Sequence, residues 1–267
     1  MERTALVTGA SSGIGLATAK ALVSRGFRVF GTSRDPDRLK PEQRADGVDY
    51  LALDLEDDAS IDSLAGPLAE VDVLVNNAGE SQSGPIEELP MDALRRIFQV
   101  NVLGPVRVAQ LVLPGMRERR YGRVVMVGSM LASFPLAYRS SYVASKAAIK
   151  GFSNGARQEL TPFGVWMTTV EPGSIATGIS ERRTKYIGEG SPYREDFARM
   201  LAALDRNERA GITAERVAQT IVAAIEADRP KARYAVGSNA PAVFALRRLL
   251  PSGVVEKIVH RRHDLSR

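Results

Sequence analysis

The chain has 267 residues, a length that suits one α/β domain or at most two small ones. It has no cysteine, and its two histidines, His260 and His263, lie near the C-terminus. Disulfides, a thiolate nucleophile, a Ser-His-Asp triad and a Cys- or His-based metal site are therefore excluded from the body of the chain; no metal is expected, and acid–base chemistry there has to use Tyr, Lys, Asp or Glu. Taken alone, the net charge of +5 and the pI of about 9.6 point to a nucleic acid or an anionic membrane surface.

Short apolar runs alternate along the chain with segments in which apolar residues recur every three to four positions. In chain order, we expect strands at residues 4–8, 27–32, 48–53, 71–75, 123–127, 165–170 and 232–236. Helices are expected at residues 14–25, 58–69, 95–119, 141–160 and 213–227. Strands that alternate with helices are typical of βαβ units, so the sequence predicts a single α/β domain with a doubly wound parallel sheet of about seven strands and helices on both faces.

The domain organisation follows from this alternation. Residues 1–240 form the predicted dinucleotide-binding and catalytic domain, and residues 241–267 form a basic amphipathic tail. Within the domain, residues 174–211 show no clean period and follow the sixth predicted strand. Ligands bind at the carboxyl ends of strands in such sheets, so this segment is a candidate substrate loop or lid. The alternative is a surface excursion with no role.

A glycine-rich turn follows the first predicted strand and opens the first predicted helix. Its glycines would let the backbone approach a pyrophosphate, and the helix N-terminus behind it offers free N–H groups. Because the spacing differs from the usual G-x-G-x-x-G pattern, a tight turn without a ligand is the alternative interpretation. The residues concerned are Gly9, Ser11, Ser12, Gly13, Ile14 and Gly15.

The end of the second predicted strand indicates which dinucleotide would bind. An acidic residue there would bind the ribose 2′-hydroxyl of NAD, but Ser33 and Arg34 occupy this place. The Arg34 guanidinium, with help from Arg38, suits a 2′-phosphate, so we expect NADP(H) rather than NAD(H). Alternatively, Arg34 is a solvated surface charge.

Several further motifs occur in a fixed order. They are Asn76-Asn77-Ala78-Gly79 after the fourth strand, Asn101 in a long helix, Ser129 after the fifth strand, Tyr142-x3-Lys146, and Pro172-Gly173 after the sixth strand. In these motifs and in the glycine turn, the chain resembles the short-chain dehydrogenase/reductase family in its main, non-extended branch. The resemblance runs from residue 4 to about residue 237 and implies a Rossmann-type fold and an oxidoreductase that transfers a hydride to or from a nicotinamide cofactor.

Tyr142 and Lys146 are four residues apart on a predicted helix and therefore share one face. A nearby ammonium lowers the pKa of a phenol from about 10 towards the working range, so Tyr142 can exchange a proton with a carbonyl or an alcohol. The resemblance implies that Lys146 also binds the nicotinamide ribose, that Ser129 polarises the substrate oxygen, and that Asn101 holds a water in the proton relay.

The resemblance carries further cofactor contacts to this chain. Asp54 and Leu55 match the positions that bracket the adenine, whereas Thr177 matches the hydroxyl that meets the carboxamide. Thr8 belongs to the same motif and is either a further cofactor contact or structural, tying the first strand to the fourth. The complete set of additional expected cofactor residues is Asp54, Leu55, Asn76, Ala78, Gly79, Pro172, Gly173, Ile175 and Thr177.

Two positions depart from the family pattern. Glu80 follows Gly79 where small or apolar residues are usual, and it either lines the pocket or points to solvent. Gly128 replaces the common serine before Ser129 without an expected loss of chemistry. About 30 residues follow the last strand, and in this respect the chain is most similar to the retinol and 17β-hydroxysteroid dehydrogenase-like members.

The substrate loop predicts a bulky, hydrophobic carbonyl or alcohol substrate, unless its apolar side chains pack on the sheet or on a second subunit. These side chains are Ile175, Ile179, Tyr186, Ile187, Tyr193, Phe197, Met200 and Leu201. The resemblance implies a homodimer or homotetramer formed by the helices at 95–119 and 141–160. A regulator or scaffold that binds NADP(H) without turnover is the alternative function.

No membrane-spanning segment or signal peptide is expected, and the simplest location is cytoplasmic. Aromatic residues make up only 6% of the chain and no basic cluster interleaved with them is evident, so no nucleic-acid partner is expected. Most of the excess charge lies in residues 247–267, where six basic side chains face two acidic ones. Two short helical patterns separated by Pro251 make this tail a candidate for weak contact with an anionic membrane; packing on the substrate loop or on a partner subunit is the alternative.

Overall fold

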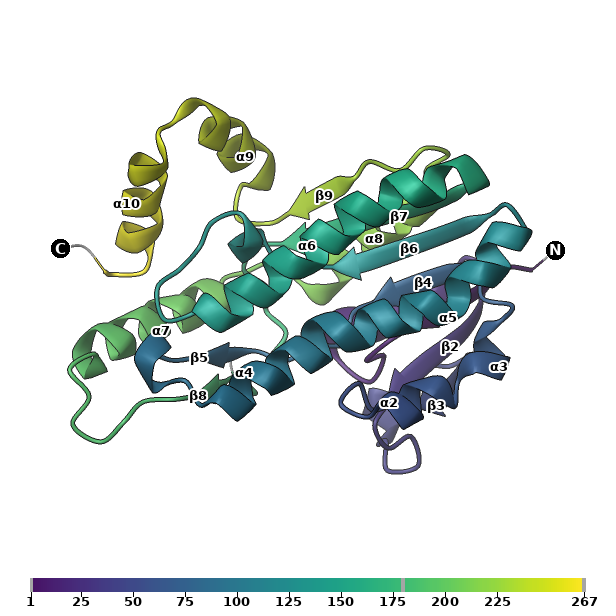
Figure 1. Cartoon of the computed structure of the whole chain (residues 1–267), viewed down its shortest axis with the longest axis horizontal. Coiled ribbons are helices and arrows are strands. Elements are labelled where there is room, and N and C mark those ends of the chain that lie inside the picture. Colours follow the sequence, from purple (N-terminus) through teal and green to yellow (C-terminus); the bar gives the residue numbers. More distant parts are fainter. Residues whose placement is uncertain (1, 179–180, 266–267) are drawn as a thin grey trace.

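The computed structural model describes residues 2–178 and 181–265. Over these ranges, seven parallel strands form one sheet in the order β3-β2-β1-β4-β6-β7-β9 (Figure 1). The reversal between β1 and β4 is the switch point of a doubly wound Rossmann-type sheet, which confirms the predicted fold class. In sheet order the strands are β3 (Val48–Ala52), β2 (Arg28–Ser33), β1 (Thr4–Val7), β4 (Val73–Asn76), β6 (Gly122–Val127), β7 (Val165–Pro172) and β9 (Arg233–Val236).

Helices cover both faces of this sheet. Each strand points apolar side chains towards both faces, so both have to be shielded from water. In β1, Ala5 and Val7 face the core under α1 (Gly13–Val23) and α8 (Ala214–Glu226). Leu6 faces the opposite core, which α5 (Gly104–Glu118) and α6 (Ser140–Leu160) cover. The core helices thus hold the strands rigidly, so that their carboxyl ends can position side chains.

The helix predicted at 58–69 is interrupted. The structure has α2 (Asp58–Asp62) and a short α3 (Ala65–Leu68) instead. Pro67 has no N–H to donate to the carbonyl of Ser63, so a continuous helix would lose a hydrogen bond there. The apolar spacing is helical throughout this segment, but proline divides it.

The helix predicted at 95–119 begins earlier and is also divided. It consists of α4 (Met91–Phe98), a π-helical turn η3 (Gln99–Leu103) and α5. Pro105 cannot donate to the carbonyl of Asn101, and the wider turn accommodates this loss. By length and composition, Met91–Glu118 is apolar enough to cross a membrane, but half of its most apolar window is buried in the fold, and the core helix of an α/β domain meets the same criterion.

Residues 174–211 contain more regular structure than the sequence predicts. They include β8 (Thr184–Lys185), which pairs with β5 (Gln82–Ser83), and the 16-residue helix α7 (Arg194–Arg209). Phe197, Met200 and Leu204 on α7 are buried against Leu136. Ile179, one of the expected loop residues, lies outside the described residues.

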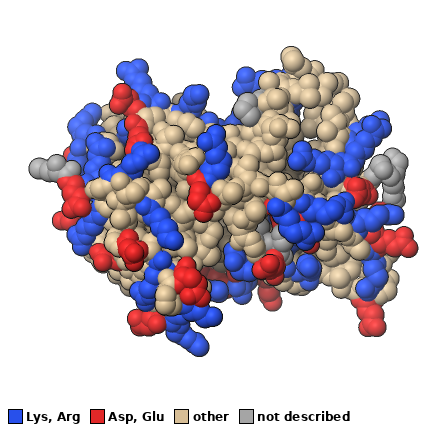
Figure 2. All heavy atoms as spheres, turned by 180° about the vertical axis from the view of Figure 1, so that it is seen from behind, with Lys and Arg blue, Asp and Glu red and all other residues tan. Residues whose placement is uncertain are grey.

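The C-terminal tail forms two helices, α9 (Ala240–Leu249) and α10 (Ser252–Arg262), beside α7 at one end of the molecule (Figure 1). Val259 and Leu265 pack on the α7 core, and Asp264 forms an ion pair with Arg206 of α7. Phe244 packs edge to face on Phe134. Of the three expected placements, namely a membrane surface, the substrate loop and a partner subunit, the structure shows contact with the substrate segment. From behind, the tail presents a largely uncharged crest, whereas Lys, Arg, Asp and Glu mingle over the body (Figure 2).

Short 3-10 helices lie between these elements. They are η1 (Pro41–Gln43), η2 (Ile86–Glu88), η4 (Met130–Ala132) and η5 (Thr161–Phe163). Of these, η4 directly follows β6 and places Ser129 at its N-terminal cap, where the Ser129 hydroxyl accepts a hydrogen bond of 3.2 Å from the Leu131 N–H. The sheet edge and η4 therefore fix the Ser129 side chain at the end of a central strand.

Candidate active site

A cavity of about 760 Å³ opens at the carboxyl ends of the strands, where the fold class predicts a ligand site. Most of the residues singled out from the sequence line it. They are Gly9, Ser11, Ser12, Gly13, Ile14, Ser33, Arg34, Asp54, Leu55, Ala78, Gly79, Ser129, Tyr142, Lys146, Pro172, Gly173, Ile175 and Thr177.

The glycine turn is shaped by close backbone packing. Gly9 has a φ of +65°, and a Cβ there would lie 3.1 Å from Ala78. Ser12, the residue before α1, makes no side-chain capping bond, so the first N–H groups of α1 keep their capacity for an anion. Gly15 does not line the cavity; a Cβ there would lie 2.1 Å from the carbonyl oxygen of Gly9, so this glycine permits the turn to pack on its helix.

Thr8 ties the first strand to the segment after the fourth. Its hydroxyl oxygen accepts hydrogen bonds of 3.0 Å from the backbone N–H groups of Asn77 and Ala78. Asn76 does not line the cavity. Its amide is buried and donates to the carbonyl oxygen of Pro105 at 2.9 Å, so it braces α5 against β4.

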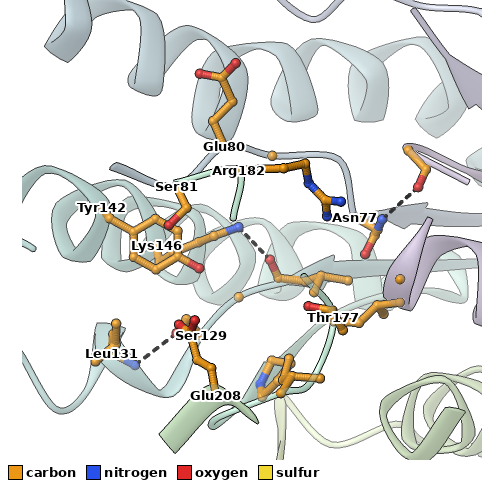
Figure 3. A pocket seen from close by; sticks show the side chains of 18 of the residues that line it. Asn77, Glu80, Ser81, Ser129, Leu131, Tyr142, Lys146, Thr177, Arg182 and Glu208 are labelled. Atoms are coloured by element: carbon orange, nitrogen blue, oxygen red, sulfur yellow. Dashed lines mark hydrogen bonds between the residues drawn. The ribbon is translucent and has the colours of Figure 1, made fainter. Parts of the chain in front are cut away.

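The catalytic candidates come together on β6 and α6. Tyr142 and Lys146 project side by side from α6 towards Ser129 (Figure 3), so the Tyr142 and Ser129 hydroxyls lie on the same side of the cavity. The Lys146 ammonium donates to the carbonyl oxygen of Val127 at 3.0 Å. All three residues are buried and line the cavity.

Burial shifts the titration of this cluster. The Tyr142 pKa is not lowered as expected from Lys146: desolvation raises it, and desolvation also lowers the pKa of Lys146 to about 8. The charge of Arg139 and the hydrogen bond with Ser129 act against the shift of Tyr142. At neutral pH Tyr142 therefore carries its proton, which is the state required to protonate a carbonyl oxygen.

Asn101 lies beneath the cavity rather than on its wall. Its Oδ1 accepts from the Glu80 N–H at 2.8 Å, and its Nδ2 donates to the carbonyl oxygen of Glu80 and to Ser145 Oγ. A Cβ on Gly79 would lie 2.9 Å from Asn101 Oδ1, so only glycine fits between them. Asn101 therefore holds the Gly79–Glu80 segment, and the water-holding role that the resemblance implies stays a prediction.

Glu80, the unusual residue after Gly79, lies at the cavity rim but points away from Tyr142 and Lys146 (Figure 3). Its carboxylate forms an ion pair of 2.6 Å with Arg96, which also pairs with Glu56. The side chain therefore supports α4 instead of reaching the reacting centre.

The far end of the cavity carries positive charge. Arg34 is exposed and lines it, and Arg38 lies on the same wall, loosely paired with Asp35 at 3.9 Å. Asp54 and Leu55 face it from the end of β3. On the opposite strands, Gly173 makes room for the Ser238 hydroxyl, because a Cβ would lie 2.4 Å from it.

Other lining residues were not identified from the sequence. Arg139 reaches the cavity from the position just before α6, Arg182 from the segment before β8, and Glu208 from α7. Contacts between distant segments place these side chains at the cavity, and no local sequence motif predicts them. The tail adds a roof of apolar and basic side chains, namely Val243, Leu246, Arg247, Leu250, Val255, Ile258, Val259, Arg262 and His263.

A hydroxyl pair beside a buried lysine, below a glycine turn at the switch point of a parallel sheet, defines a dinucleotide-dependent oxidoreductase site. Residues 3–187 match the short chain dehydrogenase family model. The chain belongs to this family.

Relatives of defined activity cover nearly the whole chain. Human 17-beta-hydroxysteroid dehydrogenase type 1 is 35% identical over 95% of this chain and 83% of its own. The NADPH-dependent 3-dehydrocapnine reductase of Ornithobacterium rhinotracheale is 32% identical over 97% and 96%. The likeness to 17β-hydroxysteroid dehydrogenases agrees with the expectation from the tail.

Solved structures agree with these relatives. A short-chain dehydrogenase from Streptomyces avermitilis superimposes with a TM-score of 0.80 at 33% identity, covering 93% of this chain and 94% of its own. A serine dehydrogenase complexed with NADP+ superimposes with a TM-score of 0.75 at 26% identity, covering 89% and 95%. The protein is thus an oxidoreductase of this family, and its cofactor is a nicotinamide dinucleotide.

Proposed function

We propose that the protein interconverts a carbonyl and an alcohol on a hydrophobic substrate with NADP(H), using Tyr142 as the acid and base. The observation that carries this proposal is that the buried side chains of Ser129, Tyr142 and Lys146 meet at the cavity wall, with Tyr142 and Lys146 on one face of α6.

The residues divide the work as follows. The Ser129 hydroxyl donates to the substrate oxygen and polarises the carbonyl. Tyr142, protonated at neutral pH because of its raised pKa, gives its proton to the oxygen during reduction and takes it back during oxidation. Hydride transfer is the chemistry that a bound nicotinamide supplies. Lys146 keeps positive charge near the Tyr142 oxygen, which favours the phenolate left behind.

The glycine turn and Arg34 support NADP(H) as the cofactor. The backbone cradle at Gly9 and Gly13 suits a pyrophosphate, since both have positive φ and a Cβ on Gly9 would crowd Ala78. Arg34 makes no ion pair among the described residues and faces the cavity, so its guanidinium is available for a 2′-phosphate. The NADPH dependence stated for the Ornithobacterium relative agrees with this assignment.

The apolar roof supports a bulky hydrophobic substrate. Leu131 and Phe134 after β6 face the cavity together with Val243 and Leu250 of the tail. A relative that is 30% identical, the 3-ketodihydrosphingosine reductase of Bacteroides thetaiotaomicron, is named for a hydrophobic ketone substrate, which supports this proposal. A turnover screen of aldehydes, ketones and alcohols of increasing chain length, with NADPH against NADH, tests the proposal. A marked preference for NADH, or for small hydrophilic ketones, would contradict it.

We also propose a homo-oligomer formed through α5 and α6. Phe152 of α6 is half-exposed, and Leu103, the last residue of η3 before α5, is 53% exposed. Light scattering of wild type and Phe152→Glu tests this interface: the charge is expected to reduce the mass to that of one chain, and an unchanged mass would refute it.

Finally, we propose weak contact of the tail with an anionic membrane. Leu249 is 81% exposed and Val254 is exposed as well, with Arg248 and Lys257 on the same two helices. Wild type is expected to sediment with anionic vesicles in low salt, and Leu249→Asp/Val254→Asp is expected to stay in solution. Equal sedimentation of the two would refute the contact.

A further inference from the structure

A second buried cation lies against Tyr142. The Arg139 guanidinium carbon is 4.3 Å from the centroid of the Tyr142 ring, whereas the Lys146 nitrogen is 5.8 Å from it. Arg139 directly precedes the first residue of α6, three positions before Tyr142, so the two side chains share one face of the first turn. Arg139 is only 2% exposed.

The hydrogen-bond partners of Arg139 are all neutral. Its Nη1 donates to Ser81 Oγ at 3.0 Å, to the Gln82 carbonyl oxygen at 2.8 Å and to Ser83 Oγ at 3.0 Å. Its Nε is buried without an acceptor. Within residues 2–178 and 181–265, no carboxylate forms an ion pair with it.

A buried guanidinium without a counter-ion is costly, and burial lowers the pKa of Arg139 to about 10. The nearby carboxylates are already engaged: Arg183, fully buried, binds Asp205 at 2.7 Å and Glu208 at 2.6 Å. The ring of Tyr142 is therefore the neighbour best placed to become negative beside Arg139.

We propose that Arg139 is the counter-ion of the Tyr142 phenolate, acting with Lys146 at the proton-transfer step. This inference rests on the proposed function. In reduction, the O–H bond of Tyr142 breaks, its proton forms a new O–H bond on the substrate oxygen, and the electron pair stays on the phenol oxygen. Arg139 keeps its proton and stabilises that negative charge across the ring face.

The other groups that face Tyr142 are accounted for. Ser129, the residue before η4, faces it, and Lys146 lies one turn further along α6. The ion pair of Arg183, the residue before β8, with Glu208 of α7 also acts on it, with compensated charge. Burial raises the pKa of Tyr142, and the charge of Arg139 is the largest influence that opposes this rise. The order of these effects agrees with the geometry.

The test uses the full chain and a direct titration of Tyr142. Tyrosinate absorbance is measured against pH, and the curve of the same chain with Tyr142→Phe is subtracted, so that the other tyrosines cancel. Arg139→Gln removes the charge but keeps a donor for Ser81. It is expected to raise the Tyr142 midpoint by about one pH unit or more, whereas Arg139→Lys is expected to keep it near the wild-type value.

A matched control removes a comparable arginine elsewhere. Arg157 stacks on Trp166 at 4.7 Å and donates to the Met167 carbonyl oxygen, outside the cavity. Arg157→Gln is expected to leave the Tyr142 midpoint unchanged. Arg139→Leu repeats the test with an apolar side chain if the glutamine variant does not fold, as judged by a thermal melt.

The outcomes separate this inference from the proposed function. A Tyr142 midpoint that Arg139→Gln or Arg139→Leu leaves unchanged overturns the counter-ion role, whatever the turnover. A raised midpoint in a chain that turns over no carbonyl or alcohol supports the counter-ion role while the proposed reaction fails. With turnover, the pH profile of kcat/KM for alcohol oxidation is expected to move to higher pH by the same amount.

Discussion

The Lys146 ammonium and the Val127 carbonyl oxygen are joined by a hydrogen bond of 3.0 Å at the carboxyl end of β6. This bond holds a buried cation beside Tyr142, and desolvation lowers the pKa of Lys146 to about 8. The fold therefore accommodates a charge that destabilises it, in a position that suits the proposed reaction.

The first prediction concerns the stability cost of this lysine. Below pH 8 it is protonated in the folded and unfolded chains, so the burial penalty is fully present; as the pH rises from about 8 to about 10.4, only the folded chain loses the proton and the penalty disappears. Without cofactor, Lys146→Met is expected to be more stable than wild type by about 2 kcal/mol at pH 7. Urea unfolding at pH 7 and pH 10 measures the difference, which should shrink at pH 10; a constant difference would disprove the lowered pKa.

The second prediction concerns the glycine turn. Gly15→Ala places a methyl group 2.1 Å from the Gly9 carbonyl oxygen and 2.6 Å from Asn77 Nδ2, so the turn has to shift. NADPH affinity is expected to fall by about tenfold or more, a loss of 1.4 kcal/mol. Gly151→Ala on α6 is the control, because nothing lies within 4 Å of its Cβ position. It should keep the affinity and gain helix stability; equal affinities of both variants would refute the role of the turn.

The third prediction concerns cofactor choice. Arg34→Leu removes the guanidinium proposed to bind the 2′-phosphate, so KM for NADPH should rise about 10- to 100-fold while KM for NADH changes little. Arg28→Leu, at the opposite end of β2, serves as control and should change neither value. Equal rises in KM for both cofactors would mean that Arg34 does not read the phosphate.

The fourth prediction concerns the roof of the cavity. Leu250 lines it and the adjacent Leu249 is exposed, so the same substitution tests both places. Leu250→Asp should raise KM for long-chain ketones about tenfold, or about 1.4 kcal/mol. A bound alkyl chain would take water away from the new carboxylate without offering a hydrogen bond, which costs free energy. Leu249→Asp should leave KM unchanged. If Leu250→Asp raises KM equally for short and long ketones, the tail does not contact the alkyl chain of the substrate.

Much of this structure could be predicted from local sequence patterns. The strand runs and the glycine turn follow from spacing along the chain, because strands of a parallel sheet all end at one edge. The resemblance to the family identified Ser129, Tyr142 and Lys146 as a set, and all three line the cavity. Of the two roles left open for Thr8, the structure shows the link between β1 and the segment after β4.

Other features depend on contacts between distant segments. Asn76 has the expected position in the chain, but Pro105 offers its amide a buried acceptor away from the cavity. Asn101 is turned beneath the floor by the π-helical turn at Gln99–Leu103. Arg139 owes its burial to Ser81 and Gln82 on β5, a contact that no local period predicts.

The most direct measurement of the central claim compares Tyr142→Phe with wild type. The phenol oxygen is removed while the ring stays, so NADPH binding, measured by fluorescence, should remain within a factor of about three. Reduction of the best ketone should fall by about 10³-fold, the size expected for loss of the general acid. A variant that binds NADPH and retains full turnover would contradict the account.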